Sequence, residues 1–136
     1  MYPQTHFLIG IFFFLIFLFV LGIFPATIIL LASVLIDIDH YTSYIFQNKK
    51  GFSFSIKNAY KWHATRQWEK EKVHPLTFFH FFEVLILILL IGLKFPVFFY
   101  IFLGFLIHLP FDIIKESRKK MLRPEKYSFI AWLIKA

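Results

Sequence analysis

Histidine and carboxylate side chains recur three or four residues apart in apolar surroundings. Three pairs have this spacing: Asp37 and His40, His80 and Glu83, and His108 and Asp112. Residues three or four apart share one face of a helix, so each pair would present an imidazole and a carboxylate together. These are ligands of divalent ions such as Zn²⁺, Mn²⁺ and Fe²⁺. The chain contains no cysteine, so a metal site would use nitrogen and oxygen ligands alone.

The composition indicates an integral membrane protein. Of the 136 residues, 59% are hydrophobic and 21 are phenylalanine, and the mean hydropathy is +0.68. A soluble domain of this length cannot bury so much apolar surface. The formal net charge is +7, but the basic residues flank apolar stretches. We therefore attribute the charge to topology and to membrane lipids, and expect no nucleic-acid partner.

Four apolar stretches are expected to cross the membrane. They cover residues 7–24, 26–40, 76–93 and 96–114. Pro25 lies in the short turn between the first two stretches, and Pro96 follows the short turn between the last two. The pattern predicts an all-α fold, a four-transmembrane-helix bundle made of two helical hairpins, with residues 1–136 forming a single membrane domain. A basic connection, residues 41–75, joins the hairpins, and a basic tail, residues 115–136, follows the last one.

The basic residues predict the orientation of the chain. Four spans would place 14 of the 15 on the side of the connection and the tail, and only Lys94 on the other side. The positive-inside rule then places both termini in the cytoplasm, with the chain in the cytoplasmic (inner) membrane. Residues 55–71 are expected to lie on the membrane surface, with Trp62 and Trp68 at headgroup level. Ser128 is expected to cap a short apolar helix in the tail.

All four predicted spans bring polar side chains to their cytoplasmic ends, and no Lys or Arg lies inside a span. Isolated carboxylates there would cost about a few kcal/mol each. A divalent cation would compensate several carboxylates at once and accept neutral imidazoles as further ligands. The predicted metal ligands are His6, Asp37, His40, His74, His80, Glu83, His108 and Asp112. Zn²⁺ is favoured, Mn²⁺ and Fe²⁺ stay open, and the set suits one or two ions.

Two further residues belong to this interpretation. Asp39 does not share a helix face with Asp37, so it is expected to orient a ligand or to act as a general base. His63, in the connection, is expected only to form a hydrogen bond or to lie at the interface.

Three motifs resemble the membrane-bound metal-dependent hydrolases of the YdjM type. They are His6-Phe-Leu-Ile-Gly10, Asp37-Ile-Asp39-His40 and Gly104-Phe-Leu-Ile-His108-Leu-Pro-Phe-Asp112. A further block, His74-Pro-Leu-Thr-Phe-Phe-His80, matches the pattern in part and lacks its Arg, Gly and final Ser. That family is distantly similar to all-α zinc-dependent phospholipase C. The resemblance therefore implies phosphoester hydrolysis close to lipid.

The sequence thus predicts a metal-dependent hydrolase whose nucleophile is a metal-activated water. Asp39 or Glu83 would be the general base, and basic residues such as Lys49, Lys50 and Arg66 would hold an anionic lipid headgroup or phosphoester. Two other classes stay open. The first is a non-catalytic membrane protein whose metal site is structural and only holds the helices together. The second is a transporter of metal ions or protons. Transport is ranked lower because the far end of the spans lacks polar residues.

Overall fold

The computed structural model describes the backbone of residues 3–118 and 123–135, and the side chains from Phe7 onward within those ranges. Every regular element in them is a helix, and no strand occurs there. The all-α prediction is therefore confirmed. The chain divides into two compact units, Met1–Ile36 with Val84–Leu122 (unit 1) and Asp37–Glu83 with Arg123–Ala136 (unit 2). The placement of one unit relative to the other is not determined.

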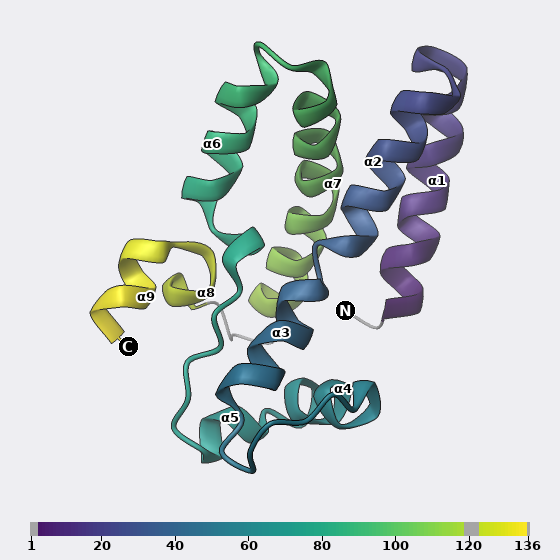
Figure 1. The fold of residues 1–136 in the computed structure, drawn as a ribbon. Coiled ribbons are helices and arrows are strands. Elements are labelled where there is room, and N and C mark those ends of the chain that lie inside the picture. Colours follow the sequence, from purple (N-terminus) through teal and green to yellow (C-terminus); the bar gives the residue numbers. More distant parts are fainter. Residues whose placement is uncertain (1–2, 119–122, 136) are drawn as a thin grey trace. The chain divides into compact units, whose positions relative to one another are not determined.

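Unit 1 contains long apolar helices (Figure 1). These are α1 (Pro3–Leu21), α2 (Ile23–Leu35), residues 84–92 of α6 (Phe82–Gly92), and α7 (Pro96–Arg118). Gly22, at φ 84°, makes the turn between α1 and α2, a backbone conformation that favours glycine. Pro96 begins α7, where its missing N–H removes no hydrogen bond.

Helices α2 and α7 approach closely at Gly104. A Cβ atom at that position would lie 2.6 Å from both the carbonyl oxygen of Ile29 and the Cβ of Ala32. Small residues permit such backbone approach between apolar helices, where van der Waals contact drives association. This contact fixes the helix that carries His108 against the helix that carries Ser33.

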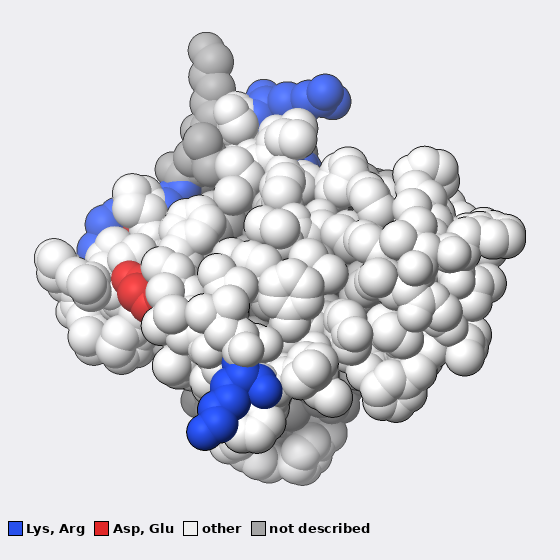
Figure 2. All heavy atoms as spheres, turned by 90° about the horizontal axis from the view of Figure 1, so that it is seen from above, with Lys and Arg blue, Asp and Glu red and all other residues white. Residues whose placement is uncertain are grey.

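Two helical segments are long and apolar enough to cross a membrane. They are Ile23–Gln47, counted through the turn between α2 and α3, and Pro96–Arg118. The described part of α1 and helix α6 are apolar but shorter. The face shown in Figure 2, seen from above the view of Figure 1, is largely uncharged. The four-span arrangement stays a prediction.

The helix boundaries near the predicted site differ from those expected. Helix α2 ends at Leu35, and α3 (Ile38–Gln47) begins after Asp37, which takes the N-cap position. The predicted span 26–40 thus contains a break between two helices, and the acidic residues open the second helix; the bounds of the span stay a prediction. Carboxylates are favourable at that end because they face the positive end of the helix dipole.

The helix predicted over residues 76–93 also begins later than expected. Residues 73–77 form a loop, Phe78–His80 form a single 3₁₀ turn, and α6 begins at Phe82. The backbone N–H of Phe79 donates to the Asp39 carboxylate at 3.0 Å, a bond that ties this turn to α3. His80 and Glu83 therefore do not share a helix face, and that part of the spacing argument is wrong.

Unit 2 is built from short helices around an aromatic core. Besides α3 it contains α4 (Ile56–Ala64), α5 (Gln67–Lys70), the 3₁₀ turn, α8 (Pro124–Tyr127) and α9 (Phe129–Lys135). Trp62 is only 1% exposed. It packs on Tyr44 with ring centroids 5.7 Å apart and donates from Nε1 to Glu71 at 2.7 Å. Trp62 is therefore buried inside unit 2 and not exposed for lipid contact, because this face of α4 is turned to α3, and its depth in the membrane stays a prediction.

The tail packs on the loop that precedes α6. The Ser128 hydroxyl and the Phe129 backbone N–H both donate to Glu83, at 2.7 and 3.1 Å. Trp132 Nε1 donates to the His74 carbonyl at 3.1 Å. Ser128 Oγ also accepts the Ala131 N–H at 3.4 Å, which agrees with the predicted cap.

Candidate metal centre

Asp39, His40 and His80 form a buried cluster in unit 2 that can hold a metal ion. One ligand atom from each lies within 4.8 Å of the other two. Asp39 and His40 come from the first turn of α3, and His80 comes from the 3₁₀ turn. The side chain of His80 is fully buried, that of Asp39 nearly so, and that of His40 is partly buried. Residues 41 positions apart in the sequence are thus brought to one site.

The Asp39 carboxylate orients His80. Its Oδ2 accepts the Phe79 N–H and lies 3.0 Å from His80 Nδ1. A proton on Nδ1 makes Nε2 the nitrogen with a lone pair for a metal. The second oxygen, Oδ1, is buried and has no hydrogen-bond partner among the described residues. A buried carboxylate oxygen in that state is unfavourable unless a cation or a proton compensates it.

Asp37 adds a second carboxylate at the same place. Its Oδ1 lies 3.6 Å from His40 Nε2 and 3.7 Å from His80 Nε2. These distances are too long for direct hydrogen bonds, but one ion or one water molecule can contact both members of either pair. The Asp37 side chain is 32% exposed, so this edge of the cluster is open to solvent or substrate.

His63 extends the cluster, although nothing in the sequence places it there. Its Nε2 lies 2.7 Å from the carbonyl oxygen of His40, and the two rings are 4.7 Å apart. Burial, aided by the positive charge of Lys126, lowers the pKa of His63 to about 4. The ring is therefore neutral near pH 7 and donates from Nε2. The expected hydrogen bond is present, but the ring is held inside unit 2, because α4 packs on α3.

An imidazole–carboxylate pair also lies in unit 1. His108 and Asp112 are buried on α7, with Nε2 and Oδ2 3.7 Å apart. His108 Nδ1 lies 2.8 Å from the backbone oxygen of Ser33 on α2. A donor bond from Nδ1 to that oxygen sets the tautomer that leaves Nε2 as the ligand atom. The prediction that this pair shares one centre with the residues of unit 2 stays a prediction.

The remaining predicted ligands are placed differently. Glu83 binds the tail through both carboxylate oxygens and caps α9, so its oxygens are engaged there. The His74 backbone carbonyl receives hydrogen bonds from Trp132 and Gln47, and its ring is not part of the described cluster. The side chain of His6 lies outside the described residues.

Arg66, predicted to hold an anionic group, is engaged within unit 2. It forms an ion pair with Glu69, and Arg123 of the tail forms a second ion pair with the same carboxylate. Both guanidinium groups lie over the ring of Trp68, at 5.8 and 4.5 Å. Glu69 and Trp68 therefore join the tail to the connection.

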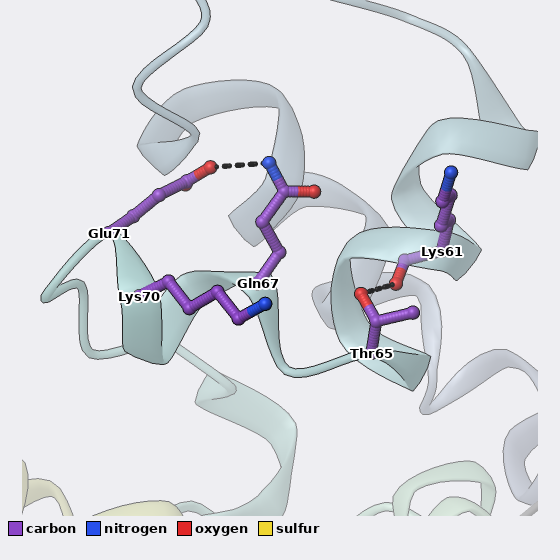
Figure 3. Close-up of a pocket in the computed structure, with 5 residues that line it drawn as sticks. All are labelled: Lys61, Thr65, Gln67, Lys70 and Glu71. Atoms are coloured by element: carbon purple, nitrogen blue, oxygen red, sulfur yellow. Dashed lines mark hydrogen bonds between the residues drawn. The ribbon is translucent and has the colours of Figure 1, made fainter.

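An open hollow of about 450 Å³ lies on α4 and α5. It is lined by Lys61, Thr65, Gln67, Lys70 and Glu71 (Figure 3). Two of these lining residues are bonded to each other, since Gln67 Nε2 donates to Glu71 at 2.9 Å. No histidine lines it, so the hollow is distinct from the metal cluster.

The chain was compared with protein-family models, with curated proteins and with solved structures, and none of them matches. The similarity to the YdjM-type hydrolases therefore depends on the motifs alone.

Proposed function

We propose that the protein is a membrane metalloenzyme that hydrolyses a phosphoester or a lipid-linked substrate. The observation that carries this proposal is the convergence of three potential ligand atoms, with Asp37 Oδ1 3.6 Å from His40 Nε2 and 3.7 Å from His80 Nε2. A divalent cation would bind the two Nε2 atoms and the Asp37 carboxylate, and the buried negative charge of Asp39 would stabilise it through the His80 ring. Two imidazoles and one carboxylate form the donor set of catalytic zinc sites with an open position, so Zn²⁺ is the proposed ion.

The residues around the cluster support distinct roles. A bound ion would supply Lewis acidity and a more acidic water. Asp39 would hold His80 in the ligating tautomer through its 3.0 Å contact with Nδ1. Asp37 is partly exposed and would bind the ion through Oδ1, and its second carboxylate oxygen would accept the proton from the attacking water. It replaces Glu83 in that role, since Glu83 is bonded to the tail.

The substrate class follows from charge and surroundings. Lys126 acts electrostatically on His63, beside the cluster, and would favour an anionic group there. Two segments have the length and composition of membrane spans, and α3 belongs to one of them. A substrate with an anionic phosphoester at the membrane surface satisfies both conditions.

The proposal is tested first by measuring the metal content of the purified protein and then by measuring its activity. Purified protein should carry stoichiometric metal, and His80→Ala should lose at least about tenfold in metal affinity. Glu69→Gln is the matched control, because it removes a carboxylate of unit 2 that lies outside the cluster, and it should retain the metal. A metal-free wild type, after reconstitution with Zn²⁺, Mn²⁺ and Fe²⁺ in turn, would contradict the proposal.

An activity assay distinguishes a metalloenzyme from a protein whose metal site is only structural. Metal-loaded protein should hydrolyse at least one member of a panel of phosphomonoesters, phosphodiesters and phospholipids, and Asp37→Asn should lose both metal affinity and activity. Retained metal with no turnover on the whole panel would favour the structural role instead.

A further inference from the structure

An exposed aromatic tip joins α3 to α4 in unit 2. Phe46, Phe52, Phe54 and Ile56 are 65–75% exposed. The rings of Phe46 and Phe52 are 5.8 Å apart, and those of Phe52 and Phe54 are 4.8 Å apart. The three rings therefore form one continuous apolar surface. Contiguous exposed apolar surface of this kind marks an interaction site.

The tip is held in place by its backbone. Gly51 has φ 95°, which permits the tight turn after α3. The Tyr41 hydroxyl donates to the Phe54 carbonyl at 2.6 Å, and Ser55 caps α4 by accepting the Asn58 N–H at 3.3 Å. Because these bonds fix the loop at both ends, the exposure of the rings belongs to the folded unit.

The charged side chains of the tip are all basic. Lys49, Lys50 and Lys57 are exposed between and beside the aromatic residues. The sequence from residue 41 to residue 68 contains no Asp or Glu. Among the described residues, none of these three ammonium groups forms an ion pair with a carboxylate. The nearby Glu71 accepts hydrogen bonds from Trp62, Gln67 and the backbone of Lys49.

We propose that this tip inserts its phenylalanines into the headgroup layer of a bilayer containing anionic lipid. Aromatic rings at that level, flanked by lysines that attract anionic headgroups, are the pattern of interfacial membrane contact. The pattern disfavours a second copy of the chain, because a symmetric contact would set the same lysines against each other. It also disfavours a protein partner, since lysine is depleted at the centre of protein interfaces. The proposal does not depend on the metal or on hydrolysis.

The absence of cysteine in the chain makes a direct test available. A single cysteine in place of Phe54, labelled with an environment-sensitive fluorophore, reports the polarity at the tip. Thr65→Cys, on the hollow of the same unit, is the matched control. The protein is reconstituted in nanodiscs of phosphatidylcholine, with or without phosphatidylglycerol.

The label at residue 54 should shift to the blue and be quenched several-fold more by a lipid-borne nitroxide when phosphatidylglycerol is present. The label at residue 65 should respond weakly in both lipids. Replacing Lys49, Lys50 and Lys57 together by Gln should remove the dependence on phosphatidylglycerol. Quenching at residue 54 by aqueous iodide equal to that at residue 65, in both lipids, would overturn the proposal. Shielding from iodide without quenching by the lipid nitroxide would indicate a protein contact and would also overturn it.

Discussion

At the scale of single residues, Asp39 links the fold of the 3₁₀ turn to the candidate metal site. One of its oxygens binds the backbone and the imidazole of the 3₁₀ turn, and the other is buried and has no hydrogen-bond partner among the described residues. A carboxylate in this position both stabilises the turn and creates a need for a cation. The same residue therefore couples folding of residues 73–81 to metal binding.

Asp39→Asn retains the size of the side chain and removes its charge. We expect metal affinity to fall by about 10- to 100-fold, as for other residues that orient metal ligands. Equilibrium dialysis with Zn²⁺ measures the loss, and Glu71→Gln, a carboxylate bonded to Trp62 on the same unit, serves as the comparison. Equal affinity in Asp39→Asn and the wild type would show that this carboxylate plays no part in binding.

Acid should release the metal. The ligating imidazoles must be neutral, so protons compete with the metal for the same nitrogens. Metal affinity should therefore fall as the pH decreases. Titration of bound Zn²⁺ from pH 8 down to the lowest pH at which the protein stays folded checks this, and an affinity that rises as the pH falls would contradict imidazole ligation.

At the scale of elements, the close contact of α2 and α7 organises unit 1. Its position depends on Gly104 facing Ala32 and the Ile29 carbonyl. The same contact lets the Ser33 carbonyl meet His108 Nδ1 at 2.8 Å. Packing of two apolar helices thus sets the orientation of a candidate ligand.

Gly104→Ala should separate these helices. The added methyl group would meet backbone atoms that cannot rotate away, so we expect a loss of about 1–3 kcal/mol in stability. Unfolding in detergent mixtures measures it, with Leu106→Ala, an exposed position on the same helix, as the control. A larger loss in Leu106→Ala than in Gly104→Ala would contradict this account of the helix contact.

The sequence predicted the elements unevenly, for physical reasons. Hydropathy identified the apolar helices, and the i,i+4 spacing identified His108 and Asp112, because both signals depend only on local periodicity. The turn at residues 36–37, the 3₁₀ turn at His80 and the burial of His63 depend on contacts between distant segments. Glu83 looked like a ligand from its spacing, although hydrogen bonds with Ser128 and Phe129 of the tail engage its oxygens.

At the scale of the whole molecule, the distribution of charge predicts how the chain lies in the membrane. Lys94 stands alone between α6 and α7, whereas the other basic residues belong to the connection and the tail. If four helices cross, the turn at Lys94 lies on the opposite side from Lys70. If α1 and α6 do not cross, that relation need not hold.

Cysteine scanning decides between these arrangements. Lys94→Cys and Lys70→Cys should be modified by a membrane-impermeant maleimide from opposite sides of sealed vesicles, with Lys135→Cys behaving as Lys70→Cys does. Modification of positions 94 and 70 from the same side would exclude the four-span topology.

X-ray absorption at the zinc edge of the Zn²⁺-loaded protein tests the metal centre most directly. The account predicts nitrogen and oxygen neighbours at about 2.0–2.2 Å, with the outer-shell scattering of two imidazoles, one of which disappears in His40→Ala and the other in His80→Ala. A shell of oxygen atoms without imidazole scattering, unchanged in both variants, would contradict it.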